Sequence, residues 1–294
     1  MRYGLKLCML ALSITITGCG ISNSHPYSIT DDAHKNRVQT PTQYAPDNNG
    51  GSYQVLNTNL DRTYYRDAIN KTGSDLKLTL QSIVGKQKVL GYNGVWKALK
   101  DTDEDPNNPN HVILFYSGRS DSKSNNGPGP TQWNREHVWA QSHGKFGRTA
   151  GIGSDLHNLK PENVKVNSDR DDLNFDLTES NETKYPKAPD TYWDDDSWEP
   201  RDEIKGDVAR IMFYMDLRYD GTNEGADKMD LELVDRMTDG PDPQFGKLTT
   251  LLRWHELDPV DEFEKKRNEI IYTYQENRNP FIDHPEWVAQ IWGR

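Results

Sequence analysis

The chain has 294 residues, with 46 acidic and 35 basic side chains and a formal net charge of −11. Only 33% of the residues are hydrophobic, and the chain has 22 Gly and 2 Cys, so the composition excludes a protein with several membrane spans, a collagen and a small disulfide-rich domain. The net charge also argues against a protein that coats nucleic acid with a basic surface, because acidic bulk charge repels phosphate.

The first residues are typical of an export signal. Arg2 and Lys6 precede an apolar run that is too short for a stable membrane span. The run ends at Ile16-Thr17-Gly18-Cys19, which resembles the site at which bacterial lipoproteins are cleaved and acylated. We therefore expect residues 1–18 to be a lipoprotein signal peptide and Cys19 to be lipidated. An ordinary signal peptide with an incidental cysteine is the alternative.

Processing at this site would change the charge and the thiol content. Loss of Arg2 and Lys6 takes the net charge from −11 to −13, and loss of Cys8 with lipidation of Cys19 removes every free thiol. A catalytic cysteine or a thiolate zinc site is then excluded. We expect the polar residues 19–52 to tether residues 53–294, a single domain, to the outer membrane or cell surface, with extracellular release as the alternative.

Hydrophobic spacing and turn residues predict the elements of this domain. In chain order they are a helix over 60–69, a helix from Ser74 or Asp75 through Ile83, a strand over 111–116, a loop over 119–131, a helix over 204–215, and a helix that opens at Asp258-Pro259 with Val260, Phe263, Ile270, Ile271 and Tyr274 on its inner face. Helices dominate and the strands cluster near the middle, so the expected class is α+β.

Two segments of the chain are rich in acidic residues and could be taken for calcium sites. Residues 171–205 hold twelve Asp or Glu against four Lys or Arg, and Asp101-x-Asp103-x-Asp105 begins like a calcium-binding loop before Pro106 interrupts it. Neither segment continues with the glycine and the bidentate glutamate that such a loop requires. We expect both to be solvated surface.

Residues 131–170 carry the candidate chemistry, and residues 134–170 have a local charge of +2. The neutral imidazole of His137 can take a proton from water near pH 7. Glu136 and Asn167 offer the oxygen ligands that Mg²⁺ prefers, and Arg170 offers paired N–H donors for a phosphate. A base, an open metal site and a phosphate clamp together indicate metal-assisted hydrolysis of a phosphodiester.

Three ordered motifs resemble the endonuclease I family, which are secreted bacterial nucleases of the His-Me finger (ββα-metal) group. They are Trp133-Asn-Arg-Glu-His-Val-Trp139, Ser154-Asp-Leu-His-Asn-Leu159 and Asn167-Ser-Asp-Arg170. Two distal segments, residues 205–215 and 277–285, resemble the family as well. The resemblance therefore spans roughly residues 53–294 and implies a mainly helical domain around a small antiparallel sheet that carries a ββα-metal finger.

The resemblance implies a role for each matching residue. His137 would be the general base, Glu136 and Asn167 would ligate one Mg²⁺ ion, and Asn158 would orient the finger and His137. Mn²⁺ and Ca²⁺ are alternative ions. Family members cut DNA, and often RNA, with little sequence preference and leave 5′-phosphates. No obligate protein partner is implied, so we expect a monomer.

The arginine that holds the phosphate is left open. In the family such an arginine lies in a longer loop after the catalytic histidine, so Arg148 is a positional candidate here, beside Arg170 and Arg278. Asn277, Arg278 and Asn279 could instead cap the C-terminal helix.

Several histidines and tryptophans of this segment have alternative interpretations. His137, His143 and His157 could form a zinc triad, which would leave Glu136 and Asn167 idle. Trp133 and Trp139 could stack on bases, although beside a strand we expect them in the core. Because neighbours on a regular strand face opposite sides, the Glu136-His137 pair must lie where a strand ends or bulges.

The sequence as a whole predicts a Mg²⁺-dependent endonuclease whose substrate is DNA or RNA. A surface-tethered nucleic-acid-binding or adhesive lipoprotein with a decayed nuclease site is the alternative. An acidic nuclease cannot use long-range attraction, so few phosphate contacts are expected.

Overall fold

The computed structural model describes residues 58–178, 184–221 and 229–293. The predicted signal peptide, Cys19 and the tether over 19–52 lie outside these residues. The described residues fall in one compact unit. Within them, no helix combines the length and the apolar character that crossing a membrane requires.

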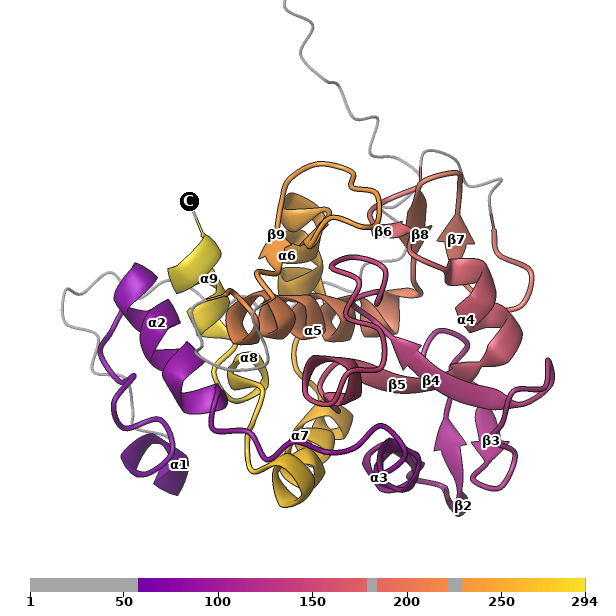
Figure 1. Cartoon of the computed structure of the whole chain (residues 1–294), viewed down its shortest axis with the longest axis horizontal. Helices are drawn as coiled ribbons and strands as arrows, with labels where there is room; N and C mark the ends of the chain where they lie inside the picture. The colour runs from indigo at the N-terminus through magenta and orange to yellow at the C-terminus, as the bar shows by residue number, and fades with distance from the viewer. Residues whose placement is uncertain (1–57, 179–183, 222–228, 294) are drawn as a thin grey trace, which may run out of the picture. The chain divides into compact units, whose positions relative to one another are not determined.

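Among the described residues, helices outweigh strands, and several of them gather around α5 (Figure 1). Their bounds are α1 Thr58–Arg62, α2 Gly73–Val84, α3 Val95–Thr102, α4 Val164–Arg170, α5 Lys205–Arg218, α6 Leu248–Leu257, α7 Glu262–Gln275, α8 Pro280–Asp283 and α9 Glu286–Trp292.

The strands are short and divide into separate sheets. Their bounds are β1 Glu104–Asp105, β2 Asn108–Ile113, β3 Ser120–Ser122, β4 Trp133–His137, β5 Leu159–Asn163, β6 Asn174–Phe175, β7 Tyr192–Trp193, β8 Ser197–Glu199, β9 Glu232–Leu233 and β10 Gln244–Phe245. The orders are β1-β2-β3, β4-β5, β6-β8-β7 and β10-β9. The α+β class is confirmed. The expected small antiparallel sheet corresponds to β4-β5, but the described residues also form separate sheets, in which the pairs β6-β8 and β9-β10 are parallel.

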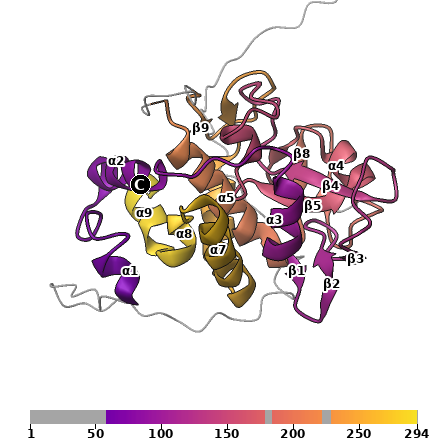
Figure 2. The same cartoon turned by 60° about the horizontal axis from the view of Figure 1, so that its bottom comes forward.

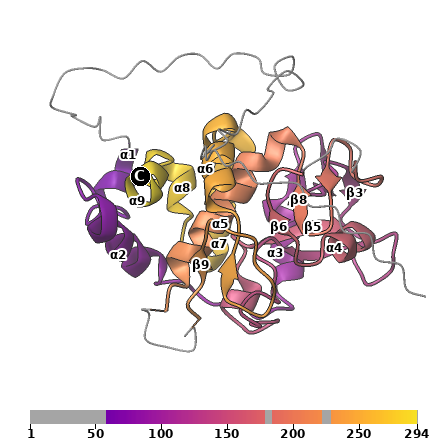
Figure 3. The ribbon, with the colours of Figure 1, turned by 90° about the horizontal axis from the view of Figure 1, so that it is seen from above.

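The core is built around α5, every residue of which is buried (Figures 1 and 3). Helices α2, α6 and α8 contact it, and its apolar residues, such as Met212 and Met215, are fully buried. A helix covered on all sides must also satisfy its polar groups. Arg210 does so by pairing with Glu264 of α7 at 2.6 Å. The helix predicted over 204–215 is therefore confirmed and extends to Arg218.

Helix α7 differs from its prediction. Asp261, not Asp258, caps it, by accepting a hydrogen bond from Glu264 N at 2.8 Å. Asp258 instead accepts from Gly206 N, at the start of α5. Of the predicted inner face only Ile271 is fully buried, because α7 turns mainly polar side chains inward. These are Glu264, Arg267, Asn268 and Gln275.

The Asp101-Asp103-Asp105 segment is not solvated surface as predicted. Asp103 is 1% exposed and pairs with Arg267 at 2.9 Å and with Lys160 at 3.4 Å. Figure 2 shows how α3 and α7 come together beside the β1-β2-β3 sheet. The acidic segment became interior because its cationic partners arrive from β5 and α7, which lie far along the chain.

Three local predictions are corrected by tertiary contacts. The first helix stops at Arg62, and the chain then turns so that the buried Tyr65 hydroxyl reaches Asp283 at 2.7 Å. Helix α2 begins at Gly73 instead of Ser74 or Asp75. The strand predicted over 111–116 ends at Ile113, where the chain turns back toward β3.

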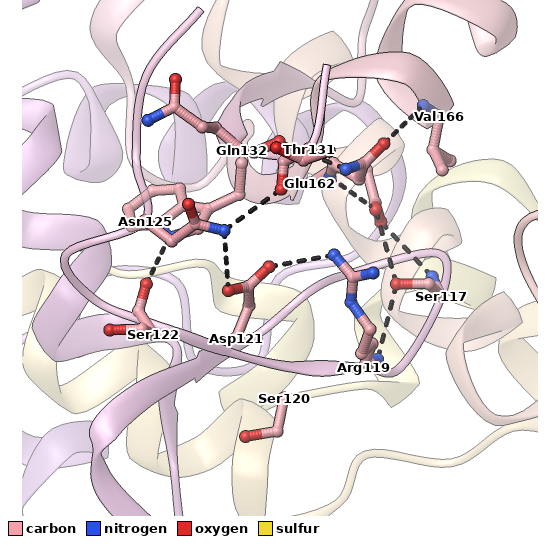
Figure 4. Close-up of polar contacts among 12 residues, drawn as sticks. Ser117, Arg119, Ser120, Asp121, Ser122, Asn125, Thr131, Gln132, Glu162 and Val166 are labelled. Atoms are coloured by element: carbon pink, nitrogen blue, oxygen red, sulfur yellow. Dashed lines mark hydrogen bonds and ion pairs between the residues drawn. The ribbon is translucent and has the colours of Figure 1, made fainter. Parts of the chain in front are cut away.

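The predicted loop over 119–131 contains the strand β3 and is fastened by polar side chains (Figure 4). Arg119 pairs with Asp121 at 2.9 Å, and the Asn125 amide donates to Asp121 and to the Thr131 carbonyl. Glu162 of β5 accepts from the backbone N–H of Ser117 at 3.3 Å. A polar segment can therefore be ordered without an apolar pattern, because side-chain hydrogen bonds replace packing.

Candidate active site

The informative segment folds as strand, strand and helix. Strands β4 and β5 pair antiparallel from Trp133 opposite Asn163 to His137 opposite Leu159, and α4 follows β5 directly. Asn163 caps α4, because its side chain accepts from the N–H groups of Lys165 and Val166. This unit brings the end of β4 beside one face of α4.

A cleft of about 570 Å³ opens at the end of β4. Alternate residues of a strand face opposite sides, so β4 contributes to two different walls. The lining residues are Tyr92, Trp96, Gly127, Pro128, Asn134, Arg135, Glu136, His137, Ala140, Gln141, Ser142, Arg148, Asn167, Ser168 and Asp171.

The wall toward α4 is rich in oxygen atoms. Asn134 and Glu136 of β4 lie there with Asn167 and Asp171 at the α4 side. The Asn167 amide donates to Asn134 Oδ1 at 2.8 Å, which ties the helix to the strand. Carboxylate and amide oxygens in this arrangement are suited to a hard divalent cation.

Glu136 is held in place within the interior. It is 2% exposed, and its Oε1 accepts from the Tyr116 hydroxyl at 2.9 Å and from Arg170 Nη1 at 3.2 Å. Burial raises the pKa of Glu136 to about 7, although Arg170 and Tyr116 act in the opposite direction. A carboxylate that is this desolvated gains from a bound cation, so the residues present fit a metal ion.

The opposite wall holds His137, which is the last residue of β4 and 6% exposed. Its Nε2 lies 3.0 Å from the Gly153 carbonyl, which can only accept a hydrogen bond. The proton is therefore on Nε2, and Nδ1 is the ring nitrogen that can accept one. Burial lowers the pKa of His137 to about 4, and the charges of Arg135 and Arg148 act in the same direction. The imidazole is thus neutral at pH 7.

The loop after β4 supports this histidine through two contacts. A Cβ on Gly153 would meet the Gly147 carbonyl at 2.5 Å, so only glycine permits the two segments to pack together. Asn158 is fully buried and both accepts from Trp139 N and donates to Trp139 O. Asn158 therefore positions the loop next to His137 without lining the cleft.

Two arginines give the histidine wall a positive charge. Arg148 is exposed and Arg135 is half-buried, and the latter guanidinium lies over the rings of Tyr92 and Trp96. Among the residues that the structure describes, no carboxylate forms an ion pair with either one. Burial lowers the pKa of Arg135, and Arg148 adds to the effect. An anion between them would relieve this repulsion.

A neutral base, oxygen ligands and unpaired cations thus face one another across a cleft. The family model described as Endonuclease I matches residues 72–286. The chain belongs to the endonuclease I family. It is accordingly an enzyme that hydrolyses nucleic acid.

Similar proteins agree with the family. An extracellular ribonuclease of Bacillus amyloliquefaciens is 56% identical over 231 residues, which is 78% of each chain. An extracellular ribonuclease of Bacillus subtilis (strain 168) is 55% identical over the same share. Endonuclease-1 of Buchnera aphidicola subsp. Acyrthosiphon pisum is 26% identical over 132 residues, or 45% of each chain.

The endonuclease I domain brings most of the residues predicted from its motifs into one place. His137, Glu136, Asn167 and Arg148 all line the cleft. The expectation that the Glu136-His137 pair lies at the end of a strand is confirmed, because β4 ends at His137. Trp133 and Trp139 are fully buried in the core, as expected.

Two predicted phosphate ligands lie elsewhere. Arg170 is fully buried and donates to Glu136 and to the carbonyls of His137 and Val138. Arg278 is 2% exposed and pairs with Asp283 and Glu269, while Asn279 caps α8. Neither arginine lines the cleft of the endonuclease I domain, so both are corrected from substrate-binding to structural positions.

The zinc alternative is also wrong. His143 is buried, and its two ring nitrogens lie 2.8 and 3.1 Å from the carbonyls of Gln244 and Asp172. His157 is buried against Tyr214 at 4.4 Å between ring centroids. Within the described part of the endonuclease I chain, no three His, Cys, Asp or Glu side chains gather as a zinc site built from protein side chains would require.

Sequence reasoning missed several cleft residues. Asn134 could have been found by strand alternation, since it lies two residues before Glu136 on the same face. Asp171 has a backbone φ of 49° and ψ of −113°, a conformation that a non-glycine residue adopts rarely. Tyr92, Trp96 and Arg135 carry no local signal, because they meet only in the folded endonuclease I domain.

Proposed function

We propose that this member of the endonuclease I family is a Mg²⁺-dependent endonuclease that cleaves RNA and DNA with little sequence preference and leaves 5′-phosphates. One observation carries the proposal. A neutral His137 and the Glu136–Asn167 oxygen ligands occupy opposite walls of a single cleft. A merely adhesive lipoprotein would have no use for this arrangement.

His137 acts as the general base. The Gly153 carbonyl fixes the proton on Nε2, so Nδ1 accepts the proton of the attacking water. The same carbonyl stabilises the imidazolium that results, because both ring nitrogens then donate. Arg148, exposed at the cleft and without an ion-pair partner in the described structure, holds the phosphate by charge and N–H donation.

Glu136 and Asn167 would hold the metal ion, with Asn134 and Asp171 on the same wall. When bound, a Mg²⁺ ion neutralises phosphate charge and stabilises the departing 3′ oxygen. Mn²⁺ or Ca²⁺ could occupy the same oxygen ligands. Arg170 contacts Glu136 Oε1 at 3.2 Å and lowers the pKa of that carboxyl, against the larger effect of burial.

The relatives favour RNA as a substrate and export as the destination. Two proteins named extracellular ribonucleases are 56% and 55% identical to this chain. We infer that the chain is exported through residues 1–18 and held at the envelope by a lipid on Cys19. It would act there as a monomer, since the resemblance to the family implies no obligate protein partner.

The proposal is tested on matched single- and double-stranded RNA and DNA, with and without EDTA. We expect cleavage of all four in Mg²⁺ at different rates, and no cleavage in EDTA. Product ends are read by a 5′-phosphate-dependent exonuclease. Activity that persists in EDTA would refute metal dependence, and failure to cut any of the four would refute the proposed function.

Two variants test the metal ligands. Glu136→Gln keeps the shape but removes the charge, and Asn167→Ala removes the amide oxygen. Both should raise the Mg²⁺ concentration for half-maximal rate by about 10-fold or more, because each removes an oxygen ligand. Asn108→Ala, on β2 away from the cleft, is the matched control. Unchanged Mg²⁺ titrations for both cleft variants would exclude this metal site.

The acidic bulk charge predicts a shallow salt dependence. The cleft presents two arginines that pair with no carboxylate of the described residues, so a single strand should make about two or three phosphate contacts there. The slope of log Kd against log salt should then be about 2, at roughly 0.7 per contact. Fluorescence anisotropy with the His137→Ala variant, which binds without cutting, measures it. A slope above about 5 would reveal a much larger basic footprint.

A further inference from the structure

The histidine wall carries side chains that the proposed chemistry does not use. Tyr92, Trp96 and Arg135, which we call the aromatic platform, all line the cleft. The Arg135 guanidinium carbon lies 3.6 Å from the Tyr92 ring centroid and 4.1 Å from that of Trp96. The guanidinium covers one face of each ring, and all three groups are half-buried, so the surface open to a ligand is the part of each that lines the cleft.

The platform is built before any ligand arrives. Trp96 lies in α3 and packs edge-on against the buried Trp133, with 5.4 Å between ring centroids. Arg135 Nη1 donates to the Tyr92 carbonyl at 2.6 Å, which fixes the loop that precedes α3. Rings that are held in this way lose little conformational entropy when they bind a flat ligand.

The platform begins at the catalytic base. The rings of Tyr92 and His137 are parallel to within 7°, and their centroids lie 6.0 Å apart. Arg148, the proposed phosphate ligand, lies 5.3 Å from the Tyr92 ring on the same wall. A nucleotide whose phosphate sits between His137 and Arg148 therefore has its base within reach of these rings.

Aromatic faces with a delocalised cation suit one part of the substrate. Nucleobases stack on aromatic rings and on guanidinium planes, whereas phosphate and sugar need charge and hydrogen bonds. A base inside a duplex is already stacked and must be displaced before it can use such a surface. Stacking is tolerant of sequence, which agrees with a nuclease of low specificity.

We propose that the aromatic platform is a nucleobase subsite that stacks the base beside the scissile phosphate and so favours unpaired nucleotides. This inference rests on the proposed nuclease function and adds the form of its substrate. It also explains how an acidic enzyme retains a single strand with few phosphate contacts.

The test combines base removal with ring removal. The substrate is a short single-stranded DNA oligonucleotide in which methylphosphonates leave one cleavable linkage. The nucleotide on either side of that linkage carries either thymine or an abasic tetrahydrofuran. For one of the two positions, wild-type kcat/KM should fall by about 10-fold without the base, the size of one base–aromatic stack.

The variants Tyr92→Leu and Trp96→Leu keep apolar bulk but remove the ring. Each should lower kcat/KM on the substrate with the base and respond little to base removal. Tyr272→Leu, which removes an exposed tyrosine of α7 outside the cleft, should behave like wild type.

Separate outcomes would overturn the inference and the proposed function. A wild-type enzyme that cuts abasic and base-containing strands equally well would refute the nucleobase subsite, whatever the variants do. Equal losses on both substrates in the leucine variants would mean that the rings serve only the fold. Failure of the wild type to cut these strands and also the four matched RNA and DNA substrates would instead refute the nuclease proposal.

Discussion

Replacement of His137 by alanine should lower kcat/KM for RNA by about 10²–10⁴-fold, the range of a lost general base. The chain should remain folded, because β4 is held to β5 by its backbone ladder and to α4 by Arg170. Loss of the ring leaves a small gap beside Tyr92 and Phe146, so a modest fall in Tm is expected. Initial rates and thermal unfolding measure the two effects separately.

Two controls decide whether His137 is the base. His111→Ala removes a histidine of β2 outside the cleft and should cut at the wild-type rate. Added imidazole should restore part of the activity of His137→Ala and none to Glu136→Gln, because only the first variant lacks a proton acceptor. A wild-type rate in His137→Ala would assign the base to another group.

Replacement of Arg170 by methionine should have the largest effect on stability, a loss of about 3–5 kcal/mol in the free energy of unfolding. The residue is fully buried, and it neutralises Glu136 while donating to the carbonyls of His137 and Val138. Removing one member of a buried pair leaves the other uncompensated. Urea unfolding at pH 8, above the pKa of about 7 that burial gives Glu136 in the wild type, measures the loss.

A double variant separates the buried pair from a phosphate clamp. Arg170→Met with Glu136→Leu removes both charges and should recover part of the lost stability, although it will be inactive. Arg148→Met changes an exposed arginine and should alter stability by less than about 0.5 kcal/mol while raising KM. If Arg170→Met kept full stability and raised only KM, the phosphate role predicted from the sequence would be right.

Arg170 and Arg148 show what a sequence motif can predict and what it cannot, because the first is buried in the protein and the second is exposed at the cleft. Arg170 follows Asn167 in a nuclease-like motif, and an arginine at that place suits a phosphate. In the structure the last turn of α4 points it inward, because Glu136 and two carbonyls at the end of β4 need a donor. Sequence shows which groups are available, whereas burial decides whether a charge meets substrate or protein.

Tertiary contacts also decide whether an acidic residue is buried and which face of a helix packs inward. Asp103 looked like solvated surface and α7 was expected to bury an apolar stripe. They meet instead across an interior ion pair between Asp103 and Arg267. Asp103 and Arg267 lie 164 residues apart, so no local sequence pattern can predict this ion pair. Apolar periodicity predicted α5 correctly, because apolar contacts dominate there. It predicted the wrong buried face for α7, where buried polar groups form ion pairs and hydrogen bonds.

The acidic composition was the first property to bear on function. Taken as a bulk quantity it argued against a nucleic-acid partner, and the positive local charge of residues 134–170 showed that charge is distributed unevenly. The cleft shows the same uneven distribution of charge. Its oxygen ligands lie on one wall, and the arginines that pair with no carboxylate of the described residues lie on the other. The net charge describes the whole chain, whereas substrate binding depends on the few groups at the cleft.

The sequence by itself determined the family and placed His137, Glu136 and Asn167 together, because two paired strands and the helix after them form a local unit of about forty residues. Only the tertiary structure decided which arginines are free, that Gly153 orients the histidine, and that Tyr92 and Trp96 join the cleft. Tyr92 lies 43 residues before Arg135, and the contact exists only once α3 packs beside β4. Elements held by local hydrogen bonds can be predicted from a pattern in the sequence. Contacts between distant segments cannot, because they depend on how the whole domain folds.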